Sequence, residues 1–377
     1  MNLVKYFPEG VALGEAFINR DKERSYLIKR IQSNKHSVLM APRRYGKTSL
    51  VIKVADELKT PYSTIDFLAS YSEEYVRDQI VNKVSRLVFE LLPRMAKAKE
   101  HLINIFKKMN PEITIGAFGQ KLTLRMSSSP LQDITDLLLK LDETAQYFKK
   151  NAVIFMDEFQ QISQLKNYHS IEASIRHAVE RSKNISYVFS GSNRKLLKQM
   201  FGEQSRPLYR LCQTIHIERM HPDVYIDRFH SLASKKWGKE LFPETIQRIF
   251  ELTELHPFYV NVLCQNLWEE ENIPSLQKVD EIWEEFVKNQ KNIISHDLTS
   301  LSINQKKMMT ALSKNPIREA QAIDFISPLK ISASSAQQSI EALIQNDFVY
   351  KDLNGFYRVL DPAVKYYIDV VLWGNSK

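Results

Sequence analysis

The apolar positions of the first 220 residues fall into short runs separated by helical patterns. Five runs of five or six residues are rich in β-branched and bulky apolar side chains, as expected of strands that are covered on both faces. Strands that alternate with helical segments are typical of a parallel sheet flanked by helices, so we predict an α/β domain. The predicted strands are residues 37–41, 62–67, 152–156, 185–189 and 213–217.

A long insertion, residues 93–130, separates the second predicted strand from the third. Within it, residues 113–125 ("ITIGAFGQKLTLR") alternate apolar and polar positions around a glycine-containing turn, which predicts a β-hairpin. Between Arg77 and Arg125 ten Lys and Arg residues face four Asp and Glu. A segment of this charge could attract nucleic acid or an acidic partner, or it could be the solvated face of a helix.

The pattern changes twice in the second half of the chain. From His221 to His296 it is helical throughout, and from Ser302 onward three helical stretches precede two short strands around Asn354-Gly355, a strong turn signal. Three helices followed by a hairpin are the order of a winged helix-turn-helix. We therefore expect three domains: an α/β domain (1–220), a helical lid (221–298) and a winged helix (299–377).

Composition narrows the class of protein. Hydrophobic residues make up 44% of the chain and charged residues 25%, and no run approaches the roughly 18 apolar residues of a membrane span. The first residues, "MNLVKYFPEG", lack the apolar segment of a secretory signal. Cys212 and Cys264 are too few for a disulfide framework or a zinc site. These features favour a reduced cytoplasmic location.

Residues 38–50 read "VLMAPRRYGKTSL", which is close to the phosphate-binding loop called Walker A. In such loops Gly46 would let the backbone approach an anion, Lys47 would reach the outer phosphates and the Thr48 hydroxyl would ligate Mg²⁺. Ala41 stands where the pattern has glycine. An alanine adds little backbone strain at this position only if its φ stays negative. The expected nucleotide contacts here are Pro42, Arg43, Arg44, Tyr45, Gly46, Lys47, Thr48 and Ser49.

A second motif supplies acids. In "AVIFMDEFQQI" an apolar run ends in Asp157 and Glu158, as in a Walker B segment. At the end of a strand next to the phosphate loop, Asp157 could hold the metal, and Glu158 could polarise the water that attacks a phosphate. Strand ends with solvated acids are common when they occur alone. The presence of both loop and acid pair predicts a site for ATP or ADP with Mg²⁺.

A third run, "YVFSGSNRKLLKQMF", ends in small polar residues. Ser190, Ser192 or Asn193 could contact the γ-phosphate or orient the attacking water. Ser192 or Asn193 could equally be the N-cap of the helix that follows.

Together these motifs resemble the prokaryotic AAA+/STAND-type ATPases of the archaeal-ATPase family. "APRRYGKTSL" is similar to that family's "GPRRxGKTSL", "FINRDKERSYL" to its "GRExE" stretch, and "ELTELHPFYVNVLCQNLW" to its lid helix. The chain differs from the family where relatives have glycine, at Asn19, Ala41 and Leu255. The resemblance implies that Ile18, Asn19 and Arg20 lie near the adenine, and that His256 and Pro257 border the nucleotide.

Two arginines in "RPLYRL", Arg206 and Arg210, are candidates for an arginine that completes a neighbouring subunit's site or senses the nucleotide in cis. They could instead form surface ion pairs, especially Arg206. Arg43 and Arg44 could face a partner subunit or simply be solvated.

We interpret the chain as a Mg²⁺-dependent ATPase, with slow to moderate hydrolysis, that acts as a molecular switch for a protein partner or for self-association. The catalytic candidates are Glu158, Lys47, Asn193 and Arg210, and the metal ligands are Thr48 and Asp157. The alternative is a nucleotide-gated DNA-binding regulator that acts through the winged helix. Its candidate recognition helix, 333–346, has no Lys or Arg, although DNA affinity depends on basic side chains.

Overall fold

The computed structural model describes residues 5–92, 104–107, 112–116, 119–123, 129–352 and 354–372. The chain divides into two compact units, one made of Asn19–Glu218 and the other of Met1–Ile18 with Arg219–Lys377. We call them the sheet unit and the helical unit, and each is described by itself.

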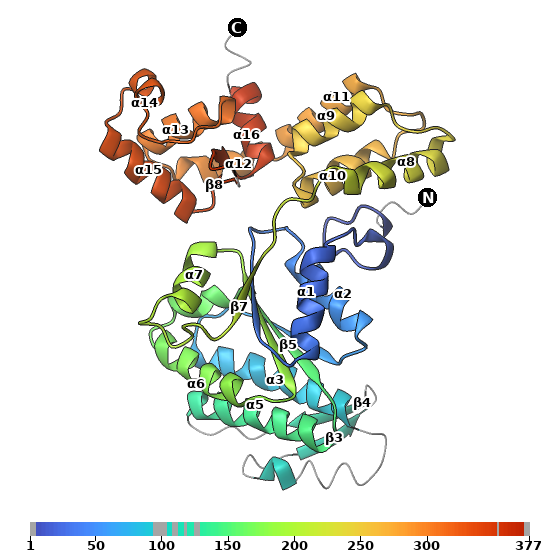
Figure 1. Ribbon diagram of the computed structural model, residues 1–377, viewed down its shortest axis with the longest axis vertical. Coiled ribbons are helices and arrows are strands. Elements are labelled where there is room, and N and C mark those ends of the chain that lie inside the picture. Colours follow the sequence, from blue (N-terminus) through green and yellow to red (C-terminus); the bar gives the residue numbers. More distant parts are fainter. Residues whose placement is uncertain are drawn as a thin grey trace. The chain divides into compact units, whose positions relative to one another are not determined.

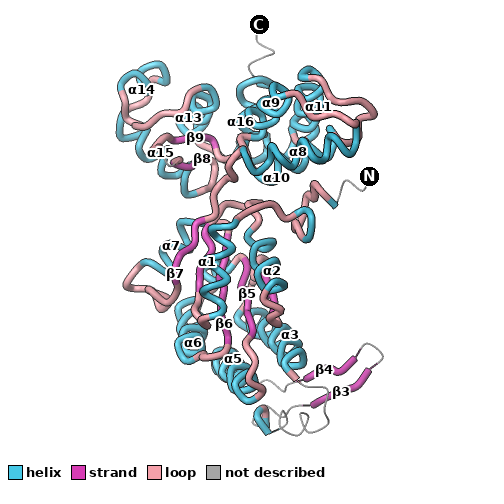
Figure 2. The backbone as a smooth tube through the Cα atoms, turned by 45° about the vertical axis from the view of Figure 1, so that its right-hand side comes forward, coloured by secondary structure: helices cyan, strands magenta, loops and turns pink. Residues whose placement is uncertain are grey.

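The sheet unit contains a parallel five-stranded sheet in the order β2-β5-β6-β1-β7. All five predicted strands are confirmed, and helices cover both faces of the sheet (Figures 1 and 2). The strands are β1 (Ser37–Met40), β2 (Tyr62–Asp66), β5 (Ala152–Asp157), β6 (Ile185–Gly191) and β7 (Gln213–His216).

The helices of this unit follow from amphipathic segments and local caps. Residues of α3, α5 and α6 form one core with alternate residues of the central strands, and the buried residues of α1 and α2 lie outside that core. Ser72, for example, caps α3 by accepting a hydrogen bond from the Tyr75 N–H. The helices are α1 (Asp21–Gln32), α2 (Lys47–Glu57), α3 (Glu73–Leu91), α5 (Pro130–Tyr147), α6 (Tyr168–Arg181), α7 (Arg194–Gly202) and the 3₁₀ helix η4 (Phe159–Gln164).

One expectation for this sheet was too simple. We expected every strand to be buried on both faces, but only β1, β5 and β6 are buried along almost their whole length. In β7 three of the four residues are exposed, and β2 is half-buried, because these two strands lie at the sheet edges.

The insertion contains the predicted hairpin. Its strands β3 (Glu112–Gly116) and β4 (Gly119–Thr123) pair in antiparallel fashion. The rest of residues 93–130, apart from 104–107 and 129–130, lies outside the described residues, and so do five of the ten basic residues between Arg77 and Arg125.

The helical unit includes the N-terminal segment of the chain. Phe7 is fully buried, with its ring 5.0 Å from that of Trp268 and 6.4 Å from that of Phe229. The hydrophobic gain of burying this ring explains why Met1–Ile18 joins Arg219–Lys377. The segment contains the 3₁₀ helix η2 (Gly14–Ala16).

The remaining elements of the helical unit are helices followed by one hairpin. Ser302 and Gln305 form a capping box at the start of α13, and Gly355 has a φ of 83° in the hairpin turn. The predicted helical region and winged helix are both confirmed. The elements are α8 (Asp223–Trp237), α9 (Pro243–Thr253), α10 (Pro257–Leu267), α11 (Leu276–Asn289), α12 (Lys291–Thr299), α13 (Ile303–Lys314), α14 (Ile323–Leu329), α15 (Ala333–Gln345), β8 (Val349–Lys351), β9 (Tyr357–Val359), α16 (Pro362–Tyr366) and the π-helical turn η5 (Tyr367–Leu372).

The three-domain division, with its boundary at 298/299, stays a prediction. Within the described part of the chain, none of the helices combines the length and the apolar character that crossing a bilayer requires.

Candidate functional site

The phosphate loop connects β1 to α2, as the sequence predicted. Gly46 is the N-cap of α2 with a φ of 84°, a left-handed conformation that glycine adopts without strain. Ala41 is fully buried and does not have a positive φ, so its methyl group causes no backbone strain. The substitution of the first glycine is therefore compatible with the loop.

The basic side chains of the loop differ in their burial. Lys47 is buried, and its Nζ donates to the carbonyl oxygens of Ala41 (3.2 Å) and Pro42 (3.1 Å). The ammonium group thus lies against the first residues of its own loop. The loop leads into the N-terminus of α2, and helix N-termini attract anions. Arg43 and Arg44 are exposed, and the Nε of Arg43 lies 3.4 Å from the Ser192 hydroxyl.

Asp157 lies beside this loop. Its Oδ2 accepts a hydrogen bond from the Thr48 hydroxyl at 2.9 Å, and its Oδ1 accepts from the Ser190 hydroxyl and from the Glu158 N–H. We expected β5 to be the strand next to the phosphate loop, but β6 lies between β5 and β1. Ser190 lies in β6, between the strands that carry Asp157 and the loop. Its hydrogen bond to Oδ1 helps to orient the Asp157 carboxylate toward Thr48.

Glu158 is held by different donors. Its Oε2 accepts hydrogen bonds from the Gln160 side-chain amide (2.6 Å) and the Ser192 hydroxyl (2.7 Å). Burial would raise the pKa of this carboxyl, but these bonds and the charge of Lys47 lower the pKa below its ordinary value. Glu158 also has a φ of 49°, and strained backbone of this kind is concentrated at functional sites.

Gln160 is a part of the site that the sequence analysis missed. It is almost fully buried, and its amide is one of the two side chains that hold Glu158. A Cβ added to Gly191 would lie 1.7 Å from the Gln160 Oε1, so only glycine leaves room for this side chain. The available signal was a glutamine two residues after the acid pair, which is weak because glutamines at strand ends are usually solvated.

Two predicted catalytic residues have other roles in the described structure. Asn193 is the N-cap of α7, because its side-chain oxygen accepts a hydrogen bond from the Leu196 N–H. Arg210 is exposed, has a φ of 54° and lies over the Tyr209 ring at 4.9 Å. Neither contacts the Asp157–Glu158 pair in the described hydrogen bonds, and their assignment as catalytic stays a prediction.

Arg206 forms an ion pair, but the pair is not on the surface. Its side chain is 10% exposed and donates from Nε (3.1 Å) and from Nη2 to Glu172, whose side chain is fully buried. The guanidinium also lies 4.6 Å from the centre of the Tyr168 ring. The surface ion pair that we considered is therefore replaced by a buried one.

The residues expected near the adenine (Ile18, Asn19 and Arg20) and those expected to border the nucleotide (His256 and Pro257) are divided between the two units. Asn19 and Arg20 belong to the sheet unit, whereas Ile18, His256 and Pro257 belong to the helical unit. Arg20 donates to the Tyr45 carbonyl of the phosphate loop at 3.2 Å. The predicted contacts of these five residues with a nucleotide stay predictions, as do those of Tyr45 and Ser49, which are both buried.

Comparison with known proteins agrees with this arrangement. Residues 282–369 match a family described as a probable winged helix domain. Comparison with curated protein sequences gives no match. Among solved structures, the Walker-type ATPase PABY2304 of Pyrococcus abyssi is similar with a TM-score of 0.68 and 16% identity, over 94% of this chain and 96% of that one.

A second similar structure is the ORC2 protein of Aeropyrum pernix, with a TM-score of 0.54 and 11% identity. The match covers 96% of this chain and 97% of that chain. At these identities the similarity establishes the fold. The resemblance that the motifs suggested is confirmed at that level: the chain has the fold of archaeal Walker-type ATPases, a parallel α/β core with helical regions and a C-terminal winged helix domain.

Proposed function

We propose that the protein is an adenine-nucleotide switch that binds ATP with Mg²⁺ at the phosphate loop and hydrolyses it slowly. The observation that carries this proposal is the 2.9 Å hydrogen bond between Thr48 and Asp157, which unites two motifs that lie far apart in the sequence. A chance Walker A sequence would have no reason to lie against an acid pair. The ORC2 structure was determined as ADPNP and ADP complexes, which supports the choice of nucleotide.

The oxygen atoms that meet at this point fit a magnesium ion. The Thr48 hydroxyl and the Asp157 carboxylate are hard ligands of the type that Mg²⁺ prefers. Once bound, the ion would neutralise charge on the β- and γ-phosphates. In the proposed state Thr48 and Asp157 would exchange their mutual hydrogen bond for contacts with it.

The residues of the chain have separate tasks in this proposal. The α2 N-terminus and Lys47 bind the phosphates, which requires Lys47 to leave the carbonyls of Ala41 and Pro42. Glu158 orients a water and accepts its proton, and Ser192 and Gln160 fix the direction of its carboxylate. Because the pKa of Glu158 is lowered, its carboxylate is ionised at neutral pH and can accept a proton.

The test is nucleotide binding by the full chain and by Lys47→Ala, measured by calorimetry with ATP or ADP in the presence of Mg²⁺. Loss of the ammonium should weaken binding at least about tenfold, which is 1.4 kcal/mol. Lys53→Ala is a matched control, since Lys53 lies on the same helix but pairs with Glu57. Equal affinities for all three proteins would reject the phosphate loop as the site.

The consequence of nucleotide binding is, we propose, a change in how the helical unit engages a protein partner or a second copy of the chain. The second candidate function is nucleotide-gated DNA binding. It is favoured by the hairpin β8–β9, called the wing, where Lys351 lies over the Tyr357 ring at 4.8 Å and the nearby Arg318 lies over the Phe356 ring at 4.6 Å. Cations and aromatic rings together suit a nucleic acid.

The two candidates differ in their dependence on salt. Each phosphate neutralised on DNA releases counterions, so a DNA-binding wing should lose affinity steeply between low and moderate salt. Binding of duplex DNA that is weak and barely changes with salt would leave the partner switch as the better proposal. The exposed residues of α15, such as Ser334 and Gln338, carry no positive charge and favour that outcome.

A further inference from the structure

The two units are connected at two points in the chain, after Ile18 and after Glu218. Arg20 belongs to the sheet unit and lies two residues after the first of these points. The residue is 8% exposed and its φ is 71°. Its guanidinium donates to the Glu218 carbonyl at 2.5 Å and to the Tyr45 carbonyl at 3.2 Å. Arg20 therefore joins the start of the sheet unit, its end and the phosphate loop.

The residue that follows Glu218 is a second arginine, and its guanidinium also donates to several groups. Arg219 donates to the Glu254 carbonyl (2.9 Å) and carboxylate (2.6 Å), and to the Leu360 carbonyl (2.8 Å). Its guanidinium lies 5.0 Å from the centre of the Tyr350 ring. Because Tyr350 is in β8 and Leu360 follows β9, Arg219 contacts the wing from the first position of the second segment of its unit.

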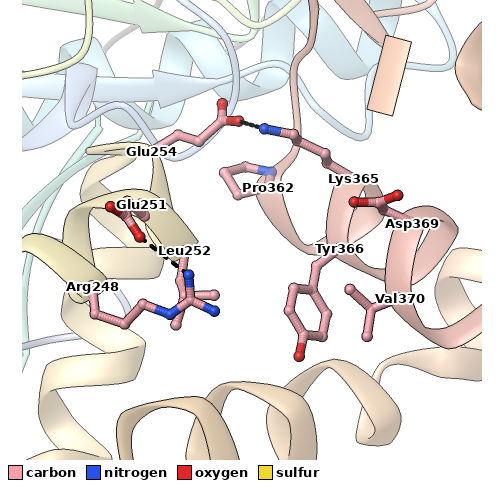
Figure 3. A pocket seen from close by; sticks show the side chains of 9 residues that line it. All are labelled: Arg248, Glu251, Leu252, Glu254, Pro362, Lys365, Tyr366, Asp369 and Val370. Carbon is pink, nitrogen blue, oxygen red and sulfur yellow. Dashed lines mark hydrogen bonds and ion pairs between the residues drawn. The ribbon is translucent and has the colours of Figure 1, made fainter. Parts of the chain in front are cut away.

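The turn that Arg219 contacts is strained. Glu254 and Leu255 have φ values of 46° and 59°, although neither is glycine. Such residues cost of the order of 1–3 kcal/mol each and persist only where surrounding contacts hold them. Here the holding contacts are Arg219 and the Lys365 ammonium, which lies 2.5 Å from the Glu254 carboxylate (Figure 3). If the contacts of Arg219 change, the strained turn at Glu254 and Leu255 can therefore relax to another backbone conformation.

We propose that Arg20 and Arg219 form an arginine relay that transmits the state of the phosphate loop to the wing. Arg20 is then a positioning residue of the loop. The Glu218 carbonyl that Arg20 binds and the amide nitrogen of Arg219 belong to one planar peptide group. Reorientation of that carbonyl rotates the backbone from which Arg219 reaches Glu254 and Leu360.

The relay rests on the proposed nucleotide site. Binding of phosphates turns the loop amides toward the anion, and the Tyr45 carbonyl moves with them. Because Tyr45 and Glu218 share one guanidinium, Arg20 must readjust to both acceptors. The wing then responds to nucleotide although no residue of the wing belongs to the phosphate-loop site.

The test is hydrogen exchange of the full chain, measured by mass spectrometry with and without ADP and Mg²⁺. In the wild-type protein ADP should change exchange about threefold in peptides from the wing and from the Glu254 turn. In Arg219→Lys, which keeps the charge but loses the fork of donors, ADP affinity should persist and the response of the wing should disappear. Arg20→Lys should lose the response and also weaken ADP binding.

Arg24→Ala is the matched control, because Arg24 lies on the same helix as Arg20 but pairs with Asp21 and Glu57. It should keep both ADP binding and the response. Glu254→Gln serves as a second variant if Arg219→Lys is unfolded, and should also lose the response.

The relay is overturned if ADP binds but leaves the wing unchanged, or if the wing responds equally in the two relay variants and the wild type. A purely structural role for these arginines would lower stability without removing the response. Failure of ADP to bind the wild-type chain would instead reject the nucleotide site, and the relay with it.

Discussion

Two largely buried glutamates, one in each unit, remain ionised for different reasons. Glu158 accepts hydrogen bonds from the neutral side chains of Gln160 and Ser192, whereas Glu254 is paired with two cations, Arg219 and Lys365. Burial opposes ionisation of both, yet in each case the partners lower the pKa below its ordinary value. A lowered pKa alone therefore does not distinguish a catalytic from a structural carboxylate.

The partners do distinguish them. Neutral donors orient Glu158 without cancelling its charge, so the carboxylate can still act on a water. The two cations cancel the charge of Glu254 and hold the turn on which it lies. We expect substitutions that break a cation-paired carboxylate, such as Glu254, to alter the stability of the protein. Substitutions at a carboxylate held by neutral donors, such as Glu158, should alter ATP turnover instead.

The largest effect is expected at a third carboxylate, Glu172, which belongs to the cation-paired type. Arg206→Met should lower the free energy of unfolding by about 4 kcal/mol, because it leaves a buried carboxylate without a cation. Urea unfolding would measure the loss, and the double variant with Glu172→Met should recover most of it.

The pH dependence of that loss has a definite sign. Burial outweighs Arg206 and raises the pKa of Glu172, so stability from this group is present below its unfolded pKa and declines as pH rises through the folded one. The Arg206→Met defect should therefore be smaller in acid. An unchanged stability together with lower ATP turnover would instead favour a role for Arg206 at a nucleotide site.

Glu158→Gln should give the next largest effect. Phosphate release should fall about 100-fold because the proton acceptor is lost, while ADP affinity and unfolding change little. Undiminished phosphate release would remove Glu158 from the mechanism and with it the contrast between the two glutamates.

Glu254→Gln should do the reverse. We expect a loss of about 2 kcal/mol at neutral pH, with phosphate release by the folded protein unchanged. Since the folded pKa of Glu254 is lowered, its stabilisation is present above the unfolded pKa and is lost as pH falls through the folded one. Unfolding curves of variant and wild type should therefore converge in acid, and a constant difference would contradict the ion-pair explanation.

The smallest effect is expected from Gly191→Ala. The new methyl group would displace Gln160, so Glu158 would lose one hydrogen-bond donor and its pKa would rise. Phosphate release should fall about tenfold, as when a supporting partner of a site is removed, and the acid limb of its pH profile should move to higher pH. Gly202→Ala is the control, since its methyl group would come no closer than 4.0 Å to the Lys198 side chain.

Local patterns were enough to predict much of the fold. The five strands are short apolar runs, and both hairpins have glycine-containing turns, so each signal lies within a few neighbouring residues. The pairing of the Lys47–Thr48 loop with Asp157 was also predictable, because carboxyl ends of parallel strands meet at one sheet edge.

Other features depend on contacts between distant segments and could not be predicted in this way. The place of β6 between β5 and β1 is set by sheet pairing, which a strand's own sequence does not encode. Burial of Gln160 depends on the missing side chain of Gly191 in another strand. Phe7 packs in the helical unit because its ring contacts those of Phe229 and Trp268, which lie more than two hundred residues further along the chain.

The position of Phe7 has a consequence for how the chain is made. A ribosome releases the residues before Asn19 first, but their partners Phe229 and Trp268 emerge only after the whole sheet unit. The sheet unit can therefore fold during synthesis, while the Phe7 side chain in the segment before Asn19 is still exposed to water. Until the chain has been translated as far as Trp268, Phe7 lacks the aromatic partners that bury it in the finished fold.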